Sequence, residues 1–117
     1  MLTRDAILAA DDLPRELVAV PEWGGDVYVR ALTGAELVPF GDAVAIEQEK
    51  DTKAIMPRLY PLLVALCACD ESGASIFTLA DAQELAGKHA GVVARVAQAA
   101  LRVNKMHEDA QEELVGN

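Results

Sequence analysis

The sequence has few aromatic residues and few cysteines, and each shortage excludes a class of protein. Of its 117 residues only 4% are aromatic although 52% are hydrophobic, so the apolar content is mostly alanine, valine and leucine. A β-sandwich would need more β-branched and aromatic side chains, whereas small and straight-chain apolar residues pack well between helices. The two cysteines, Cys67 and Cys69, cannot build a disulfide framework, which favours a reducing environment.

Positive charge and long apolar runs are also scarce. Ten basic against 19 acidic residues give a net charge of −9. Because nucleic acids and anionic membranes attract basic surfaces, we expect neither as a partner. The longest apolar stretch, residues 59–69, contains Pro61 and is shorter than the ~20 residues needed to span a bilayer. Arg4 and Asp5 interrupt any signal peptide, so we expect one soluble, intracellular domain over residues 1–117.

The order of local signals predicts an α+β fold that is mainly α, with an N-terminal β-hairpin followed by a packed set of about four helices. Thr3 can cap a short helix within residues 1–14. Two β-rich runs, residues 16–20 and 26–30, flank a turn that contains Gly24-Gly25, which predicts a hairpin within residues 15–32. Which face of the hairpin packs inward stays open, because it depends on the register of the two strands.

Residues 33–104 are predicted to form the helical body. The run Thr33-Gly34-Ala35-Glu36 has the form of a capping box, and a helix should follow it to about Lys50. Pro39 and Gly41 lie inside this helix, and we expect Pro39 to kink or delay it. The further helices are expected at about residues 56–69, 78–86 and 88–103. Residues 105–117 form an acidic tail that we expect to be a frayed helix or disordered.

No constellation of residues predicts catalysis, a metal or a cofactor. Cysteines two apart on a helix point away from each other, so Cys67 and Cys69 are interpreted as small buried hydrophobes. His89 and His107 have no partner at ligand spacing and are interpreted as surface residues. There is no glycine-rich phosphate loop and no G-x-S-x-G motif, and neighbouring acids such as Asp11-Asp12 lack the apolar surroundings that raise a pKa. The sequence therefore predicts a protein that is not an enzyme.

Apolar surface for a protein partner is the remaining candidate. Trp23 lies in the hairpin turn, where it either contacts a partner or folds back onto the core. A stripe of valines along the last helix is either core or a binding groove. A helix-rich chain with so much alanine and valine suits helix-on-helix contacts, with itself or with an extended helical client. The candidate partner-binding residues are Trp23, Tyr28, Val92, Val96 and Val103.

Three segments resemble the tail assembly chaperones of tailed phages. Residues 20–36 are similar to the family's opening, "PEWGG-x-V-x-VR-x-L-x-G-x-E", which leads into its first long helix. Residues 63–78 resemble its "VALCL-x-D-E-x-G-x-x-LF" block. Arg102-Val103-Asn104 and residues 108–117 resemble its "A-x-x-L-N" helix end and its acidic tail. The likeness covers about residues 17–117, and its specific part is the hairpin block.

The resemblance implies a non-catalytic assembly factor. Such proteins bind the helical tape-measure protein, keep it soluble, recruit tail-tube subunits and are then displaced, so they act in the host bacterial cytoplasm and are absent from the mature virion. They accompany a longer form made by programmed frameshifting, and an end at Gly116-Asn117 fits the short form. Self-association into a homo-oligomer is also expected. The alternative is a structural head–tail joining protein that remains in the phage particle.

Overall fold

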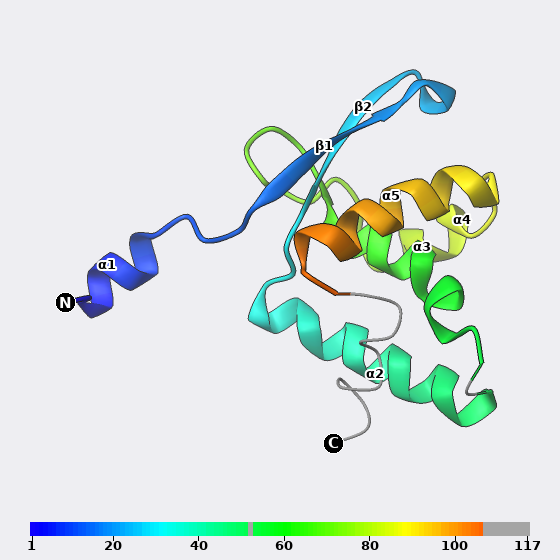
Figure 1. The fold of residues 1–117 in the computed structure, drawn as a ribbon, viewed down its shortest axis with the longest axis horizontal. Coiled ribbons are helices and arrows are strands. Elements are labelled where there is room, and N and C mark those ends of the chain that lie inside the picture. The colour runs from blue at the N-terminus through cyan, green and yellow to red at the C-terminus, as the bar shows by residue number, and fades with distance from the viewer. Residues whose placement is uncertain (52, 107–117) are drawn as a thin grey trace.

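A computed structural model describes residues 1–51 and 53–106 of the chain (Figure 1). The helices and strands, in chain order, are α1 (Arg4–Ala9), β1 (Arg15–Val20), the 3₁₀ helix η1 (Pro21–Trp23), β2 (Gly25–Arg30), α2 (Gly34–Lys50), α3 (Ile55–Cys67), β3 (Ala68–Cys69), α4 (Asp81–Leu85) and α5 (Ala90–Val103). The predicted α+β, mainly α class with an N-terminal hairpin is confirmed. The predicted acidic tail lies outside the described residues from residue 107 onward.

The hairpin of β1 and β2 forms as predicted, and its register settles which face packs inward. Val18 pairs with Val27 and Leu17 pairs with Tyr28. Residues that are directly opposite in an antiparallel pair share a face of the sheet. Val18 and Val20 are buried while Leu17 and Ala19 are exposed. The Val18 face therefore packs on the helices, and the Leu17 face points away from them.

The capping box before α2 is present as predicted. The backbone N–H of Glu36 donates to Thr33 Oγ1 at 3.1 Å, and the backbone N–H of Thr33 donates to Glu36 Oε1 at 2.9 Å. α2 then continues through Pro39 as one helix, although proline forgoes a backbone hydrogen bond. Phe40 and Val44 are fully buried and hold this helix against the core.

The prediction of a helix from residue 56 to residue 69 is wrong at its C-terminal end. α3 ends at Cys67, and Ala68 and Cys69 form β3, which pairs with Val29 and Tyr28 of β2. Asp70 stabilises the turn that follows β3, because its Oδ1 accepts hydrogen bonds from the backbone N–H groups of Ser72 and Ala74. The turn brings Ser75 back beside Cys69, and β3 itself pairs with β2, so the described residues form a sheet with the strand order β1-β2-β3.

α3 lies at the centre of the hydrophobic core. Nine of its 13 residues are buried, and it packs against α2, α4, α5 and β2. α5 lies between α3 and the hairpin, and it contacts both strands of the hairpin (Figure 1). None of the helices in the described part of the chain has the length and apolarity needed to cross a membrane.

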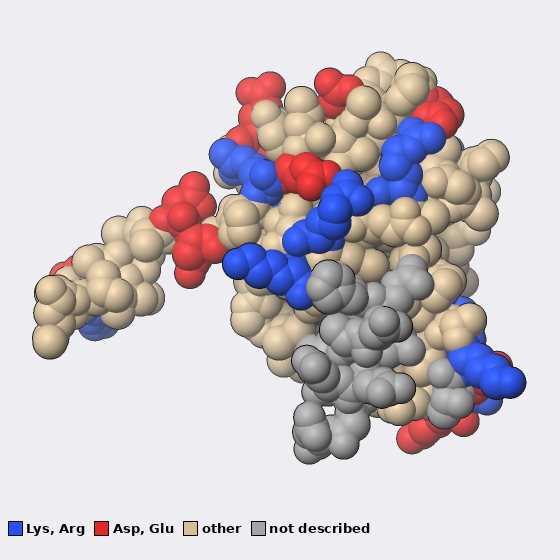
Figure 2. Space-filling model, in the orientation of Figure 1, with Lys and Arg blue, Asp and Glu red and all other residues tan. Residues whose placement is uncertain are grey.

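Two ion pairs connect the hairpin to α5, one near each end of β1. The Arg95 guanidinium contacts the Glu22 carboxylate at 2.6 Å, and Arg102 contacts Glu16 at 2.7 Å. Figure 2 shows the resulting row of basic side chains over α5, with acidic side chains beside it. Since all four side chains are at least 38% exposed, these pairs orient the hairpin more than they stabilise the fold.

α1 stands away from the rest of the protein (Figure 1). Thr3 caps it as predicted, because Thr3 Oγ1 accepts a hydrogen bond from the backbone N–H of Ala6 at 3.2 Å. No residue of this helix is buried. Residues 1–10, all of them exposed, are called the arm below.

Candidate protein-binding surface

The outward side of the hairpin is an uncovered apolar surface. Leu17 of β1 is 52% exposed and Ile76, from the loop after β3, is 49% exposed. Together with Ala19 and Tyr28 they are called the hairpin face. Leu17, Tyr28 and Ile76 line one open hollow of about 420 Å³. Monomeric soluble proteins rarely expose large apolar side chains that are grouped together. This surface is therefore a candidate contact for a partner.

Charged groups surround the hairpin face and give it a negative rim. Asp26, Asp70 and Glu71 line the same hollow, and none of the described residues that line it is basic. The Arg15 guanidinium lies 5.7 Å from the centre of the Tyr28 ring, close enough for a cation–π contact that holds this ring in place. Hydrogen bonds from Ser72 and from the backbone N–H of Ala74 lower the pKa of Asp70, which keeps its carboxylate ionised. An apolar segment flanked by basic residues would complement this surface.

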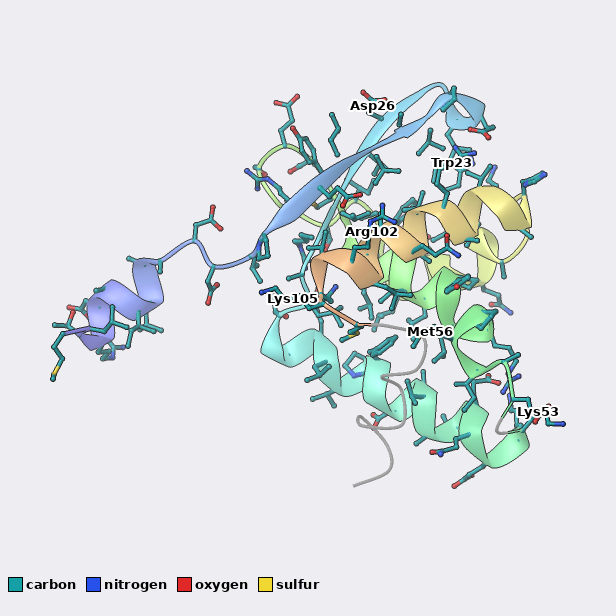
Figure 3. All side chains as sticks on the ribbon, viewed as in Figure 1. Trp23, Asp26, Lys53, Met56, Arg102 and Lys105 are labelled. Carbon is teal, nitrogen blue, oxygen red and sulfur yellow. The ribbon has the colours of Figure 1, made fainter. Side chains whose placement is uncertain are left out.

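Trp23 lies beside this surface, at the tip of the hairpin. It lines a second hollow of about 230 Å³ together with Val27 and Ile76, both of which also line the first. The Trp23 side chain is 36% exposed, so most of the ring is covered while one part remains open to a partner. Figure 3 places Trp23 on the α5 side of the hairpin tip and Asp26 on the opposite side. Of the five predicted contact residues, the structure brings Trp23 and Tyr28 to adjoining hollows.

Of the three valines predicted on the last helix, two are buried and one is partly exposed. Val92 is 2% exposed and Val96 is fully buried, and both belong to the hydrophobic core. Val103 is half-buried and packs against the same core. The stripe that they form is the side of α5 that faces the body, so a partner cannot touch Val92 or Val96 in the folded protein. Partner binding at Trp23, Tyr28 and Val103 stays a prediction.

Sequence reasoning missed the two large exposed aliphatic residues of the hairpin face, Leu17 and Ile76. Leu17 could not be assigned to a face without the register, and Ile76 stands in a polar loop where a single apolar residue carries no periodic signal. Two other exposed apolar regions were also missed. They are the arm, with Met1, Leu2, Ile7 and Leu8, and the outer side of α2, with Leu37, Val38 and Ile46.

The two cysteines are buried, and His89 caps a helix. Burial raises the pKa of the Cys67 thiol to about 12, and burial also raises the pKa of Cys69. His89 Nδ1 accepts a hydrogen bond from the backbone N–H of Gly91 at 3.1 Å, so this side chain caps α5. His107 lies outside the described residues. Within residues 1–51 and 53–106 no group of three or more His, Cys, Asp or Glu side chains is placed to hold a metal ion.

Native protein should react with thiol reagents far more slowly than unfolded protein. The thiolate is the reactive form, and burial keeps Cys67 and Cys69 protonated and out of contact with solvent. We expect DTNB to release about two equivalents of thionitrobenzoate at once in guanidinium chloride but hardly any from the folded chain at pH 8. Rapid labelling of folded protein would show that β3 detaches from β2 and exposes Cys69.

Comparison with known proteins supports the resemblance found in the sequence. A family model for phage tail assembly chaperones matches residues 3–113. The fold is similar to the solved structure of the tail assembly chaperone of bacteriophage HK97, with a TM-score of 0.56 and 19% sequence identity. The matched region covers 85% of this chain and 90% of that one. A search of curated proteins finds no match.

Proposed function

Because this chain belongs to the phage tail assembly chaperone family, we propose that it binds the helical tape-measure protein, keeps that protein soluble, recruits tail-tube subunits and is then displaced. The family itself gives a role in phage tail assembly. An exposed apolar surface of this chain supports the binding of the tape-measure protein, whereas recruitment of tail-tube subunits and displacement are what the family resemblance implies.

The observation that carries the proposal is the uncovered hairpin face. Leu17 and Ile76 are each about half exposed around an open hollow, and Tyr28 is fixed beside them under Arg15. An amphipathic helix binds by laying its apolar side on such a surface. A long tape-measure helix exposes one apolar side along its length, and covering that side prevents contacts between neighbouring helices.

The charge of the chain suits a contact that is made and later broken. The rim of Asp26, Asp70 and Glu71 attracts basic residues that flank an apolar helix side, and the net charge of −9 keeps the loaded chaperone soluble. Exposed charge pairs contribute little to affinity, so the contact can be released when tube subunits compete for the client.

The test is capture of a tape-measure fragment by a Leu17→Glu variant. Leu17 is exposed on an outward strand position, so the substitution leaves the core intact and places a charge in the hollow. We expect at least a tenfold loss of fragment recovered with the tagged chaperone. Leu79→Glu is the matched control, because Leu79 is equally exposed at 52% but lies outside the hairpin face. Equal capture by both variants would remove the hairpin face from the proposal.

The alternative of a structural head–tail joining protein makes the opposite prediction about the particle. A displaced chaperone acts in the host bacterial cytoplasm and is absent from mature virions, whereas a joining protein stays in fixed stoichiometry. Mass spectrometry of purified phage distinguishes the two. A slippery sequence near the end of the gene, followed by an overlapping frame, would further support a frameshifted long form as partner.

A further inference from the structure

The segment that follows β3 forms part of the hollow in the hairpin face. Residues 70–76 are called the turn segment, and three of them line this hollow together with residues of the hairpin, namely Asp70, Glu71 and Ile76. Within the turn segment the backbone N–H of Asp70 donates to the carbonyl oxygen of Ala74 at 3.0 Å. Beyond it, the backbone N–H of Ile76 donates to the carbonyl oxygen of Ala68 at 3.3 Å. The position of the turn segment therefore sets the shape of the hollow.

Arg30 holds the turn segment in place from the interior of the protein. Its Nε donates to the carbonyl oxygen of Gly73 at 3.0 Å, and its Nη2 donates to Ser75 Oγ at 2.9 Å. The same guanidinium donates to both carboxylate oxygens of Glu36, at 2.8 and 2.9 Å. Because a guanidinium is planar and its donors have fixed directions, the pair with Glu36 determines where the turn segment can lie. One buried side chain thus sets the turn segment relative to α2.

The turn segment also contacts the cation that holds Tyr28. Gly73 has a positive φ of 88°, and a β-carbon at this position would lie 3.1 Å from Arg15 Nη1. The Arg15 guanidinium lies in turn 5.7 Å from the centre of the Tyr28 ring. A shift of the turn segment would therefore disturb the ring that lines the hollow as well as the residues that the segment itself contributes.

The two carboxylates of the turn segment have different surroundings. Asp70 Oδ1 accepts three hydrogen bonds, from the backbone N–H of Ser72 at 2.8 Å, from Ser72 Oγ at 2.6 Å and from the backbone N–H of Ala74 at 3.1 Å. The exposed Glu71 beside it forms no ion pair with another described residue. Asp70 is thus engaged within the turn, and Glu71 is the carboxylate that is open to a partner.

We propose that Glu71 recognises a basic side chain of the client, and that Arg30 is a positioning residue that holds Glu71 and Ile76 at the hollow. This assignment rests on the proposed contact between a tape-measure helix and the hairpin face. The apolar side of such a helix would cover Leu17 and Ile76, and a lysine or arginine at the edge of that side would meet Glu71. Opposite charges at the edge of an interface select the partner and its orientation.

Reversing the charge of Glu71 tests the recognition step. We expect Glu71→Lys to raise the dissociation constant for a tape-measure fragment about tenfold at low salt, because a cation would then face the basic side chain of the client. Glu49→Lys is the matched control, since Glu49 is also exposed, lies on α2 outside the hollow and gives the same net charge. Equal dissociation constants for the two variants would overturn the role of Glu71.

Amide hydrogen exchange of the free protein tests whether Arg30 holds the turn segment. Arg30→Lys keeps a positive charge beside Glu36 but lacks the second branch that reaches the turn segment. We expect the amides of Ala74 and Ile76 to exchange about tenfold faster in this variant, and to be unchanged in Arg102→Lys, the same substitution at an exposed ion pair. Unchanged exchange at both amides in Arg30→Lys would show that Arg30 stabilises the fold without holding the turn segment.

A substitution outside the hollow links the two roles. Ser75 is exposed and does not line the hollow, so Ser75→Ala removes one acceptor of Arg30 while the protein stays folded. We expect Ser75→Ala to weaken fragment binding about threefold, Ser75→Thr to bind like wild type, and Ser75→Ala to have a much smaller effect when Glu71 is already glutamine. Equal effects of Ser75→Ala in both backgrounds would overturn the link.

Failure of this assignment can be distinguished from failure of the proposed function. A wild type that does not bind the fragment, or a Leu17→Glu variant that binds it as well as wild type, would refute the hairpin face and this assignment with it. Loss of binding in Leu17→Glu but not in Glu71→Lys would keep the hairpin face and remove only the role of Glu71. The exchange measurement needs no client and therefore tests Arg30 in either case.

Discussion

Replacing Arg30 with methionine is expected to lower the free energy of unfolding by about 3–5 kcal/mol, which is the usual cost of removing one partner of a buried ion pair. Arg30 is only 5% exposed. Its guanidinium donates two hydrogen bonds to the Glu36 carboxylate, at 2.8 and 2.9 Å, and one to the carbonyl oxygen of Gly73 at 3.0 Å. Two further bonds reach Ser75 Oγ and the Ala31 carbonyl oxygen. Urea denaturation followed by circular dichroism measures the loss.

The expected loss is large because Arg30 joins three parts of the fold. It is the last residue of β2, Glu36 lies in the first turn of α2, and Gly73 belongs to the turn after β3. The hydrogen bonds from Arg30 lower the pKa of Glu36, so the carboxylate is ionised in the native protein. Without Arg30 that charge would remain partly buried and unpaired.

A second arginine provides the control. Arg102→Met removes the ion pair with Glu16, whose two side chains are 62% and 38% exposed. Exposed pairs of this kind contribute about 0.2–1 kcal/mol, so this variant should unfold close to wild type. Similar losses for the two variants would mean that burial of Arg30 adds nothing to its interaction with Glu36.

The elements that were predicted correctly can be recognised from residues that lie close together in the sequence. The capping box needs only Thr33 and Glu36, and the hairpin needs two β-rich runs around a glycine turn, with Gly24 in the left-handed conformation at φ 86°. β3 could not be predicted in this way. Ala68 and Cys69 continue the helical pattern of α3, and they become a strand only because β2 lies beside them to accept the pairing. A tertiary contact overrides the local preference there.

The candidate site was predicted less well for a related reason. Periodicity shows that Val92 and Val96 share one side of a helix, but a stripe on the core side and a stripe on the surface look the same in a sequence. The large surface residues come from unlike segments, with Leu17 on a strand and Ile76 in a loop, and only the folded chain brings them around one hollow. Trp23 and Tyr28 could be placed on the hairpin because a hairpin turn and its strands have a recognisable sequence, and their contact with a partner stays a prediction.

Substituting Val96 with aspartate is expected to unfold the protein instead of removing a contact with a partner. Val96 is fully buried within the hydrophobic core, on the helix that lies between α3 and the hairpin. An unpaired buried carboxylate costs several kcal/mol, which is comparable with the total stability of about 5–15 kcal/mol of an ordinary domain.

The measurement is thermal unfolding of Val96→Asp beside Leu17→Glu, followed by circular dichroism. Leu17 is 52% exposed, so its variant should keep a melting temperature within a few degrees of wild type, whereas Val96→Asp should have lost its cooperative transition. If Val96→Asp fails to capture a client, the cause would then be that the protein is unfolded. Only the Leu17→Glu variant, which stays folded, tests whether the hairpin face contacts the client. A Val96→Asp chain that melts cooperatively near wild type would show that α5 can turn this side to solvent, which would return Val92 and Val96 to the candidate contact residues.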